Sequence, residues 1–398
     1  MPSAEEINSE AMWSPAVRAW RAGLASDRLL TAIVLPLTLV SSRTREGSRL
    51  VVRRSGGTSE PEPLPAGRPP SLADVAALAG VSHMTVSRVV NGAGPVRADT
   101  RRRVLDAIDH LGYRPNSLAR GLATGRSRTL GVVALDSVLY GPASTLFGVE
   151  NAAREAGYGV SVASVSAPER SLIVDAVDSL RRQGVEGAVV IAPHVAAGRA
   201  LETAPRDVPL VAVADTDEAP VPVVAVDQRD GARRATEHLL ALGHETVWHI
   251  AGPHGWLETQ VREEGWRAVL SGRGAAEPPV LRGDWSPRSG YEIGKELIGR
   301  DGADAVFVAN DQMALGLLRA LSEAGRRVPD DVRVAGFDDV PEAAYFSPPL
   351  TTVRQDFLSL GRKTFERLLG RIEGRETPAR SVVPAELIVR ESTGMRKR

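Results

Sequence analysis

The stretch LADVAALAGVSHMTVSRVVNG at residues 72–92 determines how the first folded part of the chain is built. Ser71 and Asp74 form a capping-box-like start, because their side chains can satisfy free N–H groups of the first helical turn. Gly80 then permits a tight turn at little steric cost. Between these points the apolar residues fall on one helical stripe, which comprises Leu72, Val75, Ala76 and Ala79. The pattern therefore predicts a short helix that ends in a turn.

Two further short helices follow this turn. Ser82 is a good N-cap for the second helix, and residues 91–95 (NGAGP) end it. Its inward face carries Val86, Val89 and Val90. Asp99 can cap a third helix that ends at Gly112. The buried side of that third helix carries Val104, Leu105, Ile108 and Leu111. Three short helices of this kind form the compact unit of a helix-turn-helix domain.

The outward face of the second helix carries groups that can read base edges. If its valines are buried, the side chains that point to solvent are those of His83, Met84, Ser87 and Arg88. An arginine there suits guanine O6 and N7, and a methionine suits a thymine methyl group. A bare helical hairpin with a solvated polar face is the alternative that the pattern alone leaves open.

The charge distribution favours a polyanion-binding head on an acidic body. Residues 69–129 contain nine arginines and four acidic residues, a net charge of +5, although the whole chain has a net charge of zero. Residues 1–68 carry +2, which leaves −7 for residues 130–398. The chain has no cysteine, which excludes disulfides, cysteine-ligated zinc and thiol nucleophiles and fits a reducing compartment.

Residues 1–68 differ in composition from the rest. The apolar run Leu29–Val40 is too short to span a bilayer as a helix, and Pro36 interrupts it. Acidic residues precede the run and no A-x-A cleavage pattern follows it, so a signal peptide is a poor interpretation. An Arg/Ser/Gly/Pro-rich stretch comes next. We expect a disordered extension, or a segment upstream of the natural translation start, and keep a membrane or export role as the alternative.

From residue 71 onward the sequence resembles a known family. The segments LADVAALAGVSHMTVSRVVNG, TRRRVLDAIDHLGYRPNSLARGLATGRS and TLGVV are similar to the signature of the lactose-repressor family of bacterial transcription regulators. The resemblance extends from about Ser71 to Arg390. It implies that the head binds double-stranded operator DNA through Ser82, His83, Met84, Thr85, Ser87, Arg88 and Asn91.

The resemblance also implies a hinge helix after the head. Residues 114–124 (RPNSLARGLAT) match the segment that orders on DNA in this family, although it is too short to persist in water by itself. Asn116 would cap it, and Ala119 and Leu122 would contact DNA. Leu122 stands at the position where paired leucines of two subunits enter the minor groove and kink a base step. Without the resemblance, such a leucine would be read as a core residue.

The acidic body alternates short β-branched runs with helical stretches. The expected strands are 130–135, 159–165, 187–192, 210–214, 223–227, 246–251, 305–309 and 332–337. The expected helices are 145–156, 172–183, 231–242, 261–270, 289–299, 313–324 and 358–372. Such alternation calls for parallel sheets covered by helices on both faces. The family implies a two-lobed, type I periplasmic-binding-protein-like α/β fold, with crossovers near residues 227, 354 and 384.

Polar and aromatic side chains follow several of these strands. Carboxylates, amides, one arginine and a tryptophan are the groups that bind sugar hydroxyls and cover an apolar sugar face. A strand-end carboxylate can instead simply cap the next helix. Seven of these residues coincide with inducer-contacting positions of the family's namesake: Asp215, Arg262, Trp285, Asn310, Asp338, Gln355 and Phe357. Leu139 and Pro142 match apolar positions of the same pocket.

Two departures bear on the effector. Where the namesake carries serines near the sugar hydroxyls, this chain carries Leu135 and Glu258. We therefore expect a glycoside or monosaccharide, with a galactoside as one possibility, and expect the Glu258 carboxylate to select a different hydroxyl pattern.

Motifs for enzymatic chemistry are absent from the sequence. There is no G-x-x-x-x-G-K-[ST] loop, no H-E-x-x-H and no G-x-S-x-G elbow. His238, His244, His249 and His254 lack metal-ligand spacing, so we expect structural or surface histidines. We predict no catalytic residue, no metal and no cofactor.

These observations predict a cytoplasmic, nucleoid-associated repressor that binds a palindromic operator as a homodimer and is released by a small sugar. The expected parts are the extension 1–68, the head 69–114, the hinge and linker 115–127 and the effector-binding body 128–398. Within the body, we expect an N-lobe of 128–227 and 357–384 and a C-lobe of 228–353 and 385–398.

Three alternatives remain open at this point. The first is a regulator of the same family that requires a purine or phosphorylated corepressor. The second is a sugar-binding transport protein, which would need export and would leave residues 71–124 without a purpose. The third is an enzyme with a regulatory DNA-binding head. The sequence shows no nucleophile–base pair or set of metal ligands that would support this alternative.

Overall fold

The structure is a computed structural model, which describes residues 68–92, 94–114, 125–136, 138–205, 207–216 and 218–394. The predicted extension, except Arg68, lies outside the described residues. So does the core of the predicted hinge, which includes Asn116, Ala119 and Leu122.

Three helices form the head: α2 (Leu72–Ala79), α3 (His83–Asn91) and α4 (Ala98–Leu111). The capping box at α2 is present, since the backbone N–H of Ser71 donates to Asp74 Oδ2 at 2.7 Å and the Ser71 hydroxyl accepts from the Asp74 N–H. Gly80 ends α2 with φ 63°, a left-handed value that glycine adopts without steric cost. The three helices meet in a small apolar core that includes Val75, Val86 and Val104. The helix-turn-helix prediction is thereby confirmed.

Two details of the third head helix were predicted wrongly. Its N-cap is Arg97, which makes no side-chain capping bond, and Asp99 lies inside the first turn. Leu105 is 47% exposed instead of buried. Successive residues of a helix differ in direction by about 100°. The face that carries Val104 and Ala107 inward therefore turns Leu105 to solvent.

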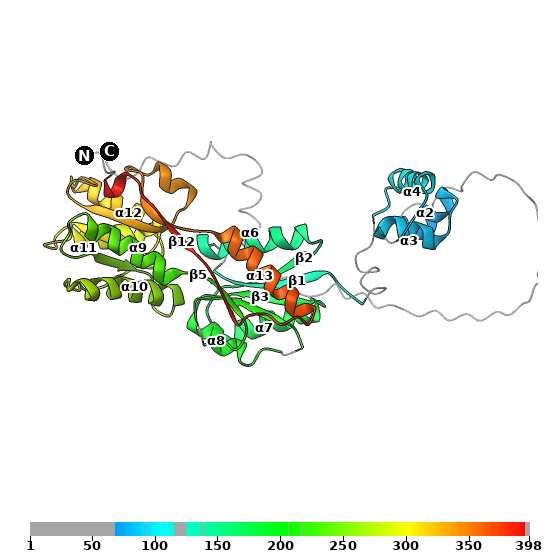
Figure 1. Ribbon diagram of the computed structural model, residues 1–398, viewed down its shortest axis with the longest axis horizontal. Coiled ribbons are helices and arrows are strands. Elements are labelled where there is room, and N and C mark those ends of the chain that lie inside the picture. Colours follow the sequence, from blue (N-terminus) through cyan, green and yellow to red (C-terminus); the bar gives the residue numbers. More distant parts are fainter. Residues whose placement is uncertain are drawn as a thin grey trace, which may run out of the picture. The chain divides into compact units, whose positions relative to one another are not determined.

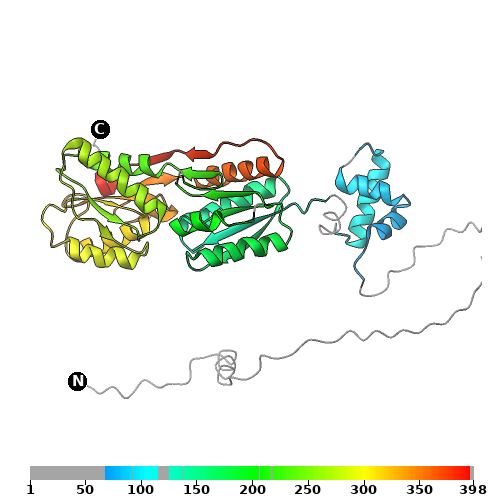
Figure 2. The same cartoon turned by 90° about the horizontal axis from the view of Figure 1, so that it is seen from below.

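The first lobe of the body is a parallel sheet with helices on both faces (Figure 1). Its strands run in the order β11-β5-β4-β3-β1-β2. Their bounds are β1 (Thr129–Leu135), β2 (Gly159–Val165), β3 (Gly187–Ile191), β4 (Leu210–Val213), β5 (Val223–Val226) and β11 (Arg380–Val383). Helices α6 (Tyr140–Glu155) and α13 (Phe357–Ile372) cover one face, and α7 (Arg170–Arg182) and α8 (Val195–Leu201) cover the other (Figure 2). The central strands are buried throughout, as expected for a sheet covered on both sides.

The second lobe repeats this plan with one antiparallel edge. Its strand order is β12-β10-β9-β8-β6-β7, and only β12 runs antiparallel to its neighbour. The strands are β6 (Trp248–Ala251), β7 (Leu281–Arg282), β8 (Ala305–Val308), β9 (Arg333–Asp338), β10 (Thr351–Gln355) and β12 (Ala385–Ile388). Helices α9 (Gln228–Ala241) and α10 (Leu257–Arg273) pack on one face, and α11 (Pro287–Leu297) and α12 (Asp311–Glu323) pack on the other. Two short 3-10 turns, Pro341–Tyr345 and Glu391–Thr393, complete the lobe.

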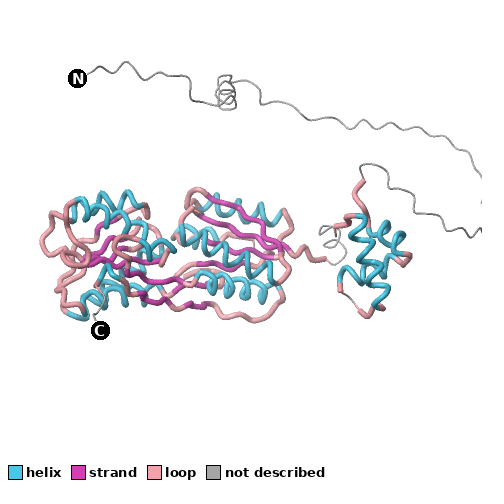
Figure 3. The backbone as a smooth tube through the Cα atoms, turned by 90° about the horizontal axis from the view of Figure 1, so that it is seen from above, coloured by secondary structure: helices cyan, strands magenta, loops and turns pink. Residues whose placement is uncertain are grey.

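The chain passes between the two sheets three times (Figure 3). It leaves the first sheet after β5, returns from β10 into α13, and leaves again from β11 into β12. Each lobe is thus built from separate parts of the chain. The α/β two-lobed architecture predicted from the sequence is confirmed.

Some elements of the body were not anticipated. The strands β7, β10, β11 and β12 and the helix α8 were missing from the prediction, because they are short and several carry polar residues. Within the described ranges, the structure holds no helix that is both long and apolar enough to traverse a bilayer.

Candidate functional site

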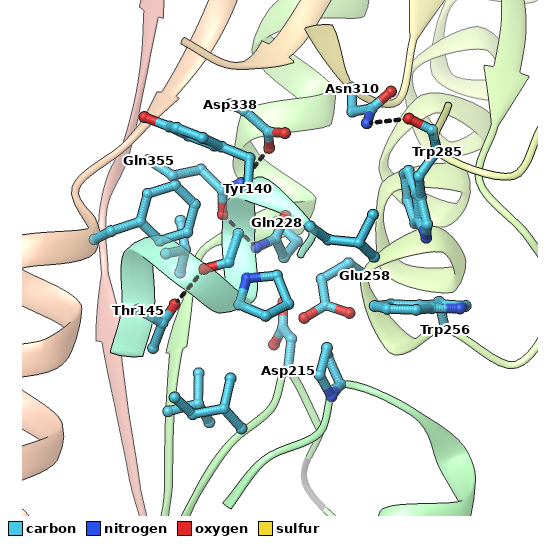
Figure 4. A pocket seen from close by; sticks show the side chains of 18 of the residues that line it. Tyr140, Thr145, Asp215, Gln228, Trp256, Glu258, Trp285, Asn310, Asp338 and Gln355 are labelled. Carbon is cyan, nitrogen blue, oxygen red and sulfur yellow. Dashed lines mark hydrogen bonds between the residues drawn. The ribbon is translucent and has the colours of Figure 1, made fainter. Parts of the chain in front are cut away.

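A cavity of about 310 Å³ is lined by residues of both lobes (Figure 4). Its size lies at the lower end of the range for small-molecule sites. All ten residues that the sequence nominated for effector binding line it: Leu139, Pro142, Asp215, Glu258, Arg262, Trp285, Asn310, Asp338, Gln355 and Phe357. They come from positions that span more than half of the chain.

The strand topology explains why these side chains meet. Asp215 follows β4, Asn310 follows β8, and Asp338 and Gln355 are the last residues of β9 and β10. Carboxyl ends of neighbouring parallel strands lie at one edge of a sheet, which is where ligands bind in such folds. Asp338 has φ 116°, a positive value that costs energy for a residue with a side chain.

A hydrogen-bonded chain centred on Arg262 forms one wall of the cavity. Arg262 Nε donates to Gln228 Oε1 at 2.8 Å, and its Nη1 donates to the Ala309 carbonyl. Gln228 Nε2 donates to Gln355 Oε1 at 2.8 Å, and Gln355 Nε2 donates to Asp338 Oδ1 at 2.6 Å. Each amide orientation is therefore fixed by its neighbours.

Arg262 is held in place by an aromatic ring as well. Its guanidinium carbon lies 3.8 Å from the ring centroid of Phe337, and the residue is only 4% exposed. Its Nη2 is 3.9 Å from Asp338 Oδ1, so the two charges face each other. Burial raises the pKa of Asp338 to about 6, while Arg262 and the Gln355 amide oppose that rise.

Asp215 and Asn310 already have partners within the protein. Asp215 pairs with Arg380 of β11, which opposes the rise in its pKa caused by burial. Asn310 caps α12, since its Oδ1 accepts from the Met313 N–H at 2.9 Å, and its Nδ2 donates to the Trp285 carbonyl at 3.1 Å. The capping role is therefore real for Asn310, and its side chain nevertheless lines the cavity.

Two tryptophans line the second lobe's side of the cavity. The rings of Trp256 and Trp285 stand edge to face, with centroids 5.7 Å apart. Trp285 Nε1 is buried and has no hydrogen-bond partner among the described residues. A methyl group at Gly252 would lie 2.2 Å from the Trp285 ring, so this position needs glycine. The parts of these rings that border the cavity suit the apolar face of a sugar.

Glu258 differs from the other carboxylates of the cavity. Its Oε2 is buried and has no hydrogen-bond partner among the described residues. Burial raises the pKa of Glu258 to about 7, with Arg262 opposing and Asp215 and Asp338 adding to the rise.

Several residues that line the cavity were not predicted from the sequence, and one residue that was expected there lies elsewhere. Trp256, Gln228, Tyr140 and Thr145 line the cavity without having been singled out. Gln228 directly follows the strand β5, which was a usable signal. Leu135, which was expected near the sugar, is fully buried in the core of the first lobe beside α7. The alternation of strand side chains turns Leu135 inward.

The head presents the predicted polar face to solvent. Ser82, His83, Met84, Arg88 and Asn91 are exposed, and Thr85 and Ser87 are half-buried. Met84 is 63% exposed, although it is apolar. Ser82 caps α3 by accepting from the Thr85 N–H, and Asn91 Nδ2 donates to the Ser87 hydroxyl at 3.1 Å.

Of the four histidines considered above, His238 contacts the Thr393 hydroxyl, His244 contacts Arg333 and Asp304, and His254 is exposed. His249 is fully buried, stacks on Phe307 with centroids 4.7 Å apart, and its Nδ1 lies 3.0 Å from the Phe307 carbonyl oxygen. Burial lowers its pKa to about 4. In the described part of the chain, no three or more His, Asp or Glu side chains are placed so that they could hold a metal ion together.

A three-helix head with an exposed polar helix face, followed by a two-lobed body with an internal cavity, defines a ligand-responsive DNA-binding regulator. Comparisons with known proteins support this class. The model of bacterial regulatory proteins of the lacI family matches residues 71–116, and that of a periplasmic binding protein-like domain matches residues 236–393.

The lactose operon repressor of Escherichia coli (strain K12) is 36% identical over 329 residues, which cover 82% of this chain and 91% of the repressor. A crystal structure of the lac repressor dimer bound to operator and the anti-inducer ONPF aligns with a TM-score of 0.75 at 35% identity, covering 82% of this chain and 100% of that one. A complex of the transcriptional regulator CelR with cellobiose aligns with a TM-score of 0.61 at 36% identity, covering 81% and 99%. The chain belongs to the lacI family of bacterial regulatory proteins.

Proposed function

We propose that this protein is a transcriptional repressor of sugar-utilisation genes that binds a palindromic operator as a homodimer and is released by a small sugar. The observation that carries the proposal is the cavity, where ten separately nominated residues converge on one polar and aromatic site. The relatives solved with operator, with ONPF and with cellobiose support the same assignment.

In this proposal the α3 face reads the operator. Arg88 and Met84 are exposed on one helix whose Val86 and Val89 are buried, as a recognition helix in a major groove requires. The head residues assigned to DNA are Ser82, His83, Met84, Thr85, Ser87, Arg88 and Asn91. One head reads half of a site, so two copies are needed for a palindrome. Asn116, Ala119 and Leu122 of the hinge complete the DNA contacts by family resemblance.

The cavity is assigned to a neutral sugar. Arg262, Asp338 and Gln355 offer donors and acceptors in fixed orientations, and Trp256 and Trp285 offer ring surfaces. A galactoside and a glucoside are both compatible with this set. The ten residues nominated from the sequence are proposed as effector contacts, with Trp256 added.

The charge of the cavity argues against a phosphorylated corepressor. Three carboxylates line the cavity, those of Asp215, Glu258 and Asp338, and Arg262 is the single basic side chain in the described lining. Arg262 already donates to Gln228 and Ala309 and faces the Asp338 carboxylate, so few of its donors are left for a phosphate, which the three carboxylates would also repel.

Release from DNA follows from thermodynamic linkage between operator binding at the heads and sugar binding in the cavity. We propose that the sugar changes the relative orientation of the lobes and separates the two hinge segments of the dimer, so that the operator affinity falls. Such coupling is typically about 1–3 kcal/mol, and operator binding must weaken sugar binding by the same factor. Residues 69–114, 115–127 and 128–398 are accordingly assigned to DNA binding, hinge and effector binding. The proposed site of action is the cytoplasm, at the nucleoid, and no catalytic step is assigned.

A selection experiment tests this function. The full chain is incubated with a pool of random duplexes, and the retained sequences are then titrated with lactose and cellobiose. We expect a palindrome to be enriched and then released by at least one of these sugars. Arg88→Ala should abolish the enrichment, whereas Arg102→Ala, an exposed arginine on α4, should retain it. Retention of random duplex with no preferred palindrome would exclude the proposed function.

A further inference from the structure

One of the three carboxylates that line the cavity has an oxygen atom without a hydrogen-bond donor in the described part of the chain. Asp215 pairs with Arg380, and Asp338 accepts from Gln355 and faces Arg262. Glu258 Oε2 has no hydrogen-bond partner among the described residues, although it is buried. A buried acceptor without a donor costs free energy, so such a group points to a donor that arrives with a ligand.

The position of Glu258 depends on contact between the lobes. It lies in the first turn of α10, directly after a backbone bridge that joins the two lobes. In this bridge the Val195 N–H donates to the Gly255 carbonyl at 3.0 Å, and the Leu257 N–H donates to the Pro193 carbonyl at 3.0 Å. The carboxylate points into the cavity between Asp215 and Trp256 (Figure 4).

The charged and titratable groups around Glu258 come from five elements. Arg262 lies one turn further along α10, Asp215 follows β4 and pairs with Arg380 at the start of β11, and Asp338 ends β9. His194, the N-cap of α8, lies beside Trp256 with ring centroids 6.4 Å apart, and burial lowers its pKa. Burial disfavours an ionised Glu258 most strongly, Arg262 opposes this effect, and Asp215 and Asp338 add to it. The carboxyl group is therefore divided between its two protonation states near neutral pH.

We propose that Glu258 is a specificity-determining residue whose carboxylate oxygen Oε2, buried and without a donor in the described part of the chain, accepts a hydrogen bond from a hydroxyl group of the effector sugar. Sugar binding then expels the proton from this carboxyl group. This inference rests on the proposed function. The proton goes to the solvent, and no covalent bond of the sugar changes.

Sugar binding and the protonation of Glu258 oppose each other. A hydroxyl donor stabilises the carboxylate, so the pKa of Glu258 falls in the complex. The free site is partly protonated at neutral pH, and a fraction of a proton is therefore released for each sugar bound. Well below the pKa of Glu258, the proton must be removed in nearly every binding event. The affinity should therefore fall by up to about tenfold for each pH unit.

Calorimetry on the full chain tests the inference. Lactose and cellobiose are titrated at pH 7 in phosphate and in Tris, whose different ionisation enthalpies reveal proton release. Glu258→Gln should release no proton at this site, and its affinity should be level between pH 6.5 and 8 and at least about tenfold weaker at pH 8. Glu264→Gln is the matched control, because Glu264 is an exposed residue of the same helix that pairs with Arg229. It should behave like the unchanged protein.

The outcomes separate this inference from the proposed function. Operator binding without sugar shows that a variant is folded, and Glu258→Asp should keep the proton release. If sugar releases the operator but Glu258→Gln expels as much of a proton as the unchanged protein, the inference is wrong and the proposed function stands. The same holds if the unchanged protein binds sugar without expelling any proton. Failure of both sugars to bind at all would overturn the inference together with the sugar assignment.

Discussion

Arg262 shows how one side chain can organise a binding site. Its guanidinium is stacked on Phe337, its Nε is bonded to Gln228, and its charge faces Asp338. A buried arginine is stable only when its donors are satisfied, and here one acceptor is Gln228, which also lines the cavity, and the other is the Ala309 carbonyl. A ligand therefore meets acceptors and donors whose directions were set before it arrived, which reduces the entropy cost of binding.

The first prediction concerns Asp338. Asp338→Ala should give a protein that still binds operator but needs at least about tenfold more sugar for release, since a hydrogen bond to a charged group contributes about 1.5–3 kcal/mol. Operator release by lactose and cellobiose, followed by fluorescence anisotropy, measures this change. Asp301→Ala is the control, because Asp301 is an exposed residue of the same lobe. Normal release of the Asp338 variant would remove this residue from the effector site.

At the scale of elements, two glycines fix the distance between α6 and α13. A methyl group at Gly361 would lie 2.2 Å from the carbonyl carbon of Gly148, and one at Gly148 would lie 2.5 Å from the Phe357 carbonyl oxygen. Backbone atoms cannot give way as the end of a flexible side chain can. The same contact holds the start of α13, and with it Phe357, against the cavity.

Gly361→Ala should therefore destabilise the body by about 1–3 kcal/mol, the usual cost of overpacking. Gly272→Ala is a matched control on α10, where the added methyl group meets nothing within 4 Å. It should be neutral or stabilise by up to about 1 kcal/mol, since alanine is the better helix former. Urea unfolding followed by circular dichroism measures both. An unchanged midpoint for the Gly361 variant would mean that the two helices tolerate a wider separation.

At the scale of the whole molecule, the head and the body have opposite electrostatic characters and different tasks. The basic head offers affinity for any duplex through phosphate contacts, and sequence preference must come from base contacts and from deformation of the DNA. The sugar acts on a body that touches no base in the proposed mechanism. The hinge segment is therefore where the two tasks have to be coupled.

The last prediction tests this coupling. Leu122→Ala should weaken binding to the selected palindrome much more than binding to random duplex, because an apolar wedge acts only where a base step is kinked. Leu105→Ala is the matched control, since Leu105 is an exposed leucine of the head. Gel-shift titrations with both duplexes give the ratio. Equal losses on the palindrome and on random duplex would contradict the wedge assignment.

The sequence by itself was sufficient for the local features of this protein. The capping box at Ser71, the turn at Gly80 and the buried valines of α3 follow from short-range rules, because caps, turns and helical periodicity involve neighbours in the chain. The βαβ alternation likewise predicted most strands of the body. The nomination of cavity residues needed family resemblance in addition, since strand-end polar residues are equally suited to capping, as Asn310 shows.

Tertiary structure alone decided the rest. It set the exposure of Leu105, the burial of Leu135 and the pairing of Asp215 with Arg380. It also left Glu258 Oε2 without a hydrogen-bond partner among the residues that the structure describes. Trp256 enters the cavity because a bridge between the lobes places it there. Each of these facts depends on which distant segments become neighbours when the sheets and helices pack. Burial and electrostatic partners are properties of that packing, and no local pattern of residues contains them.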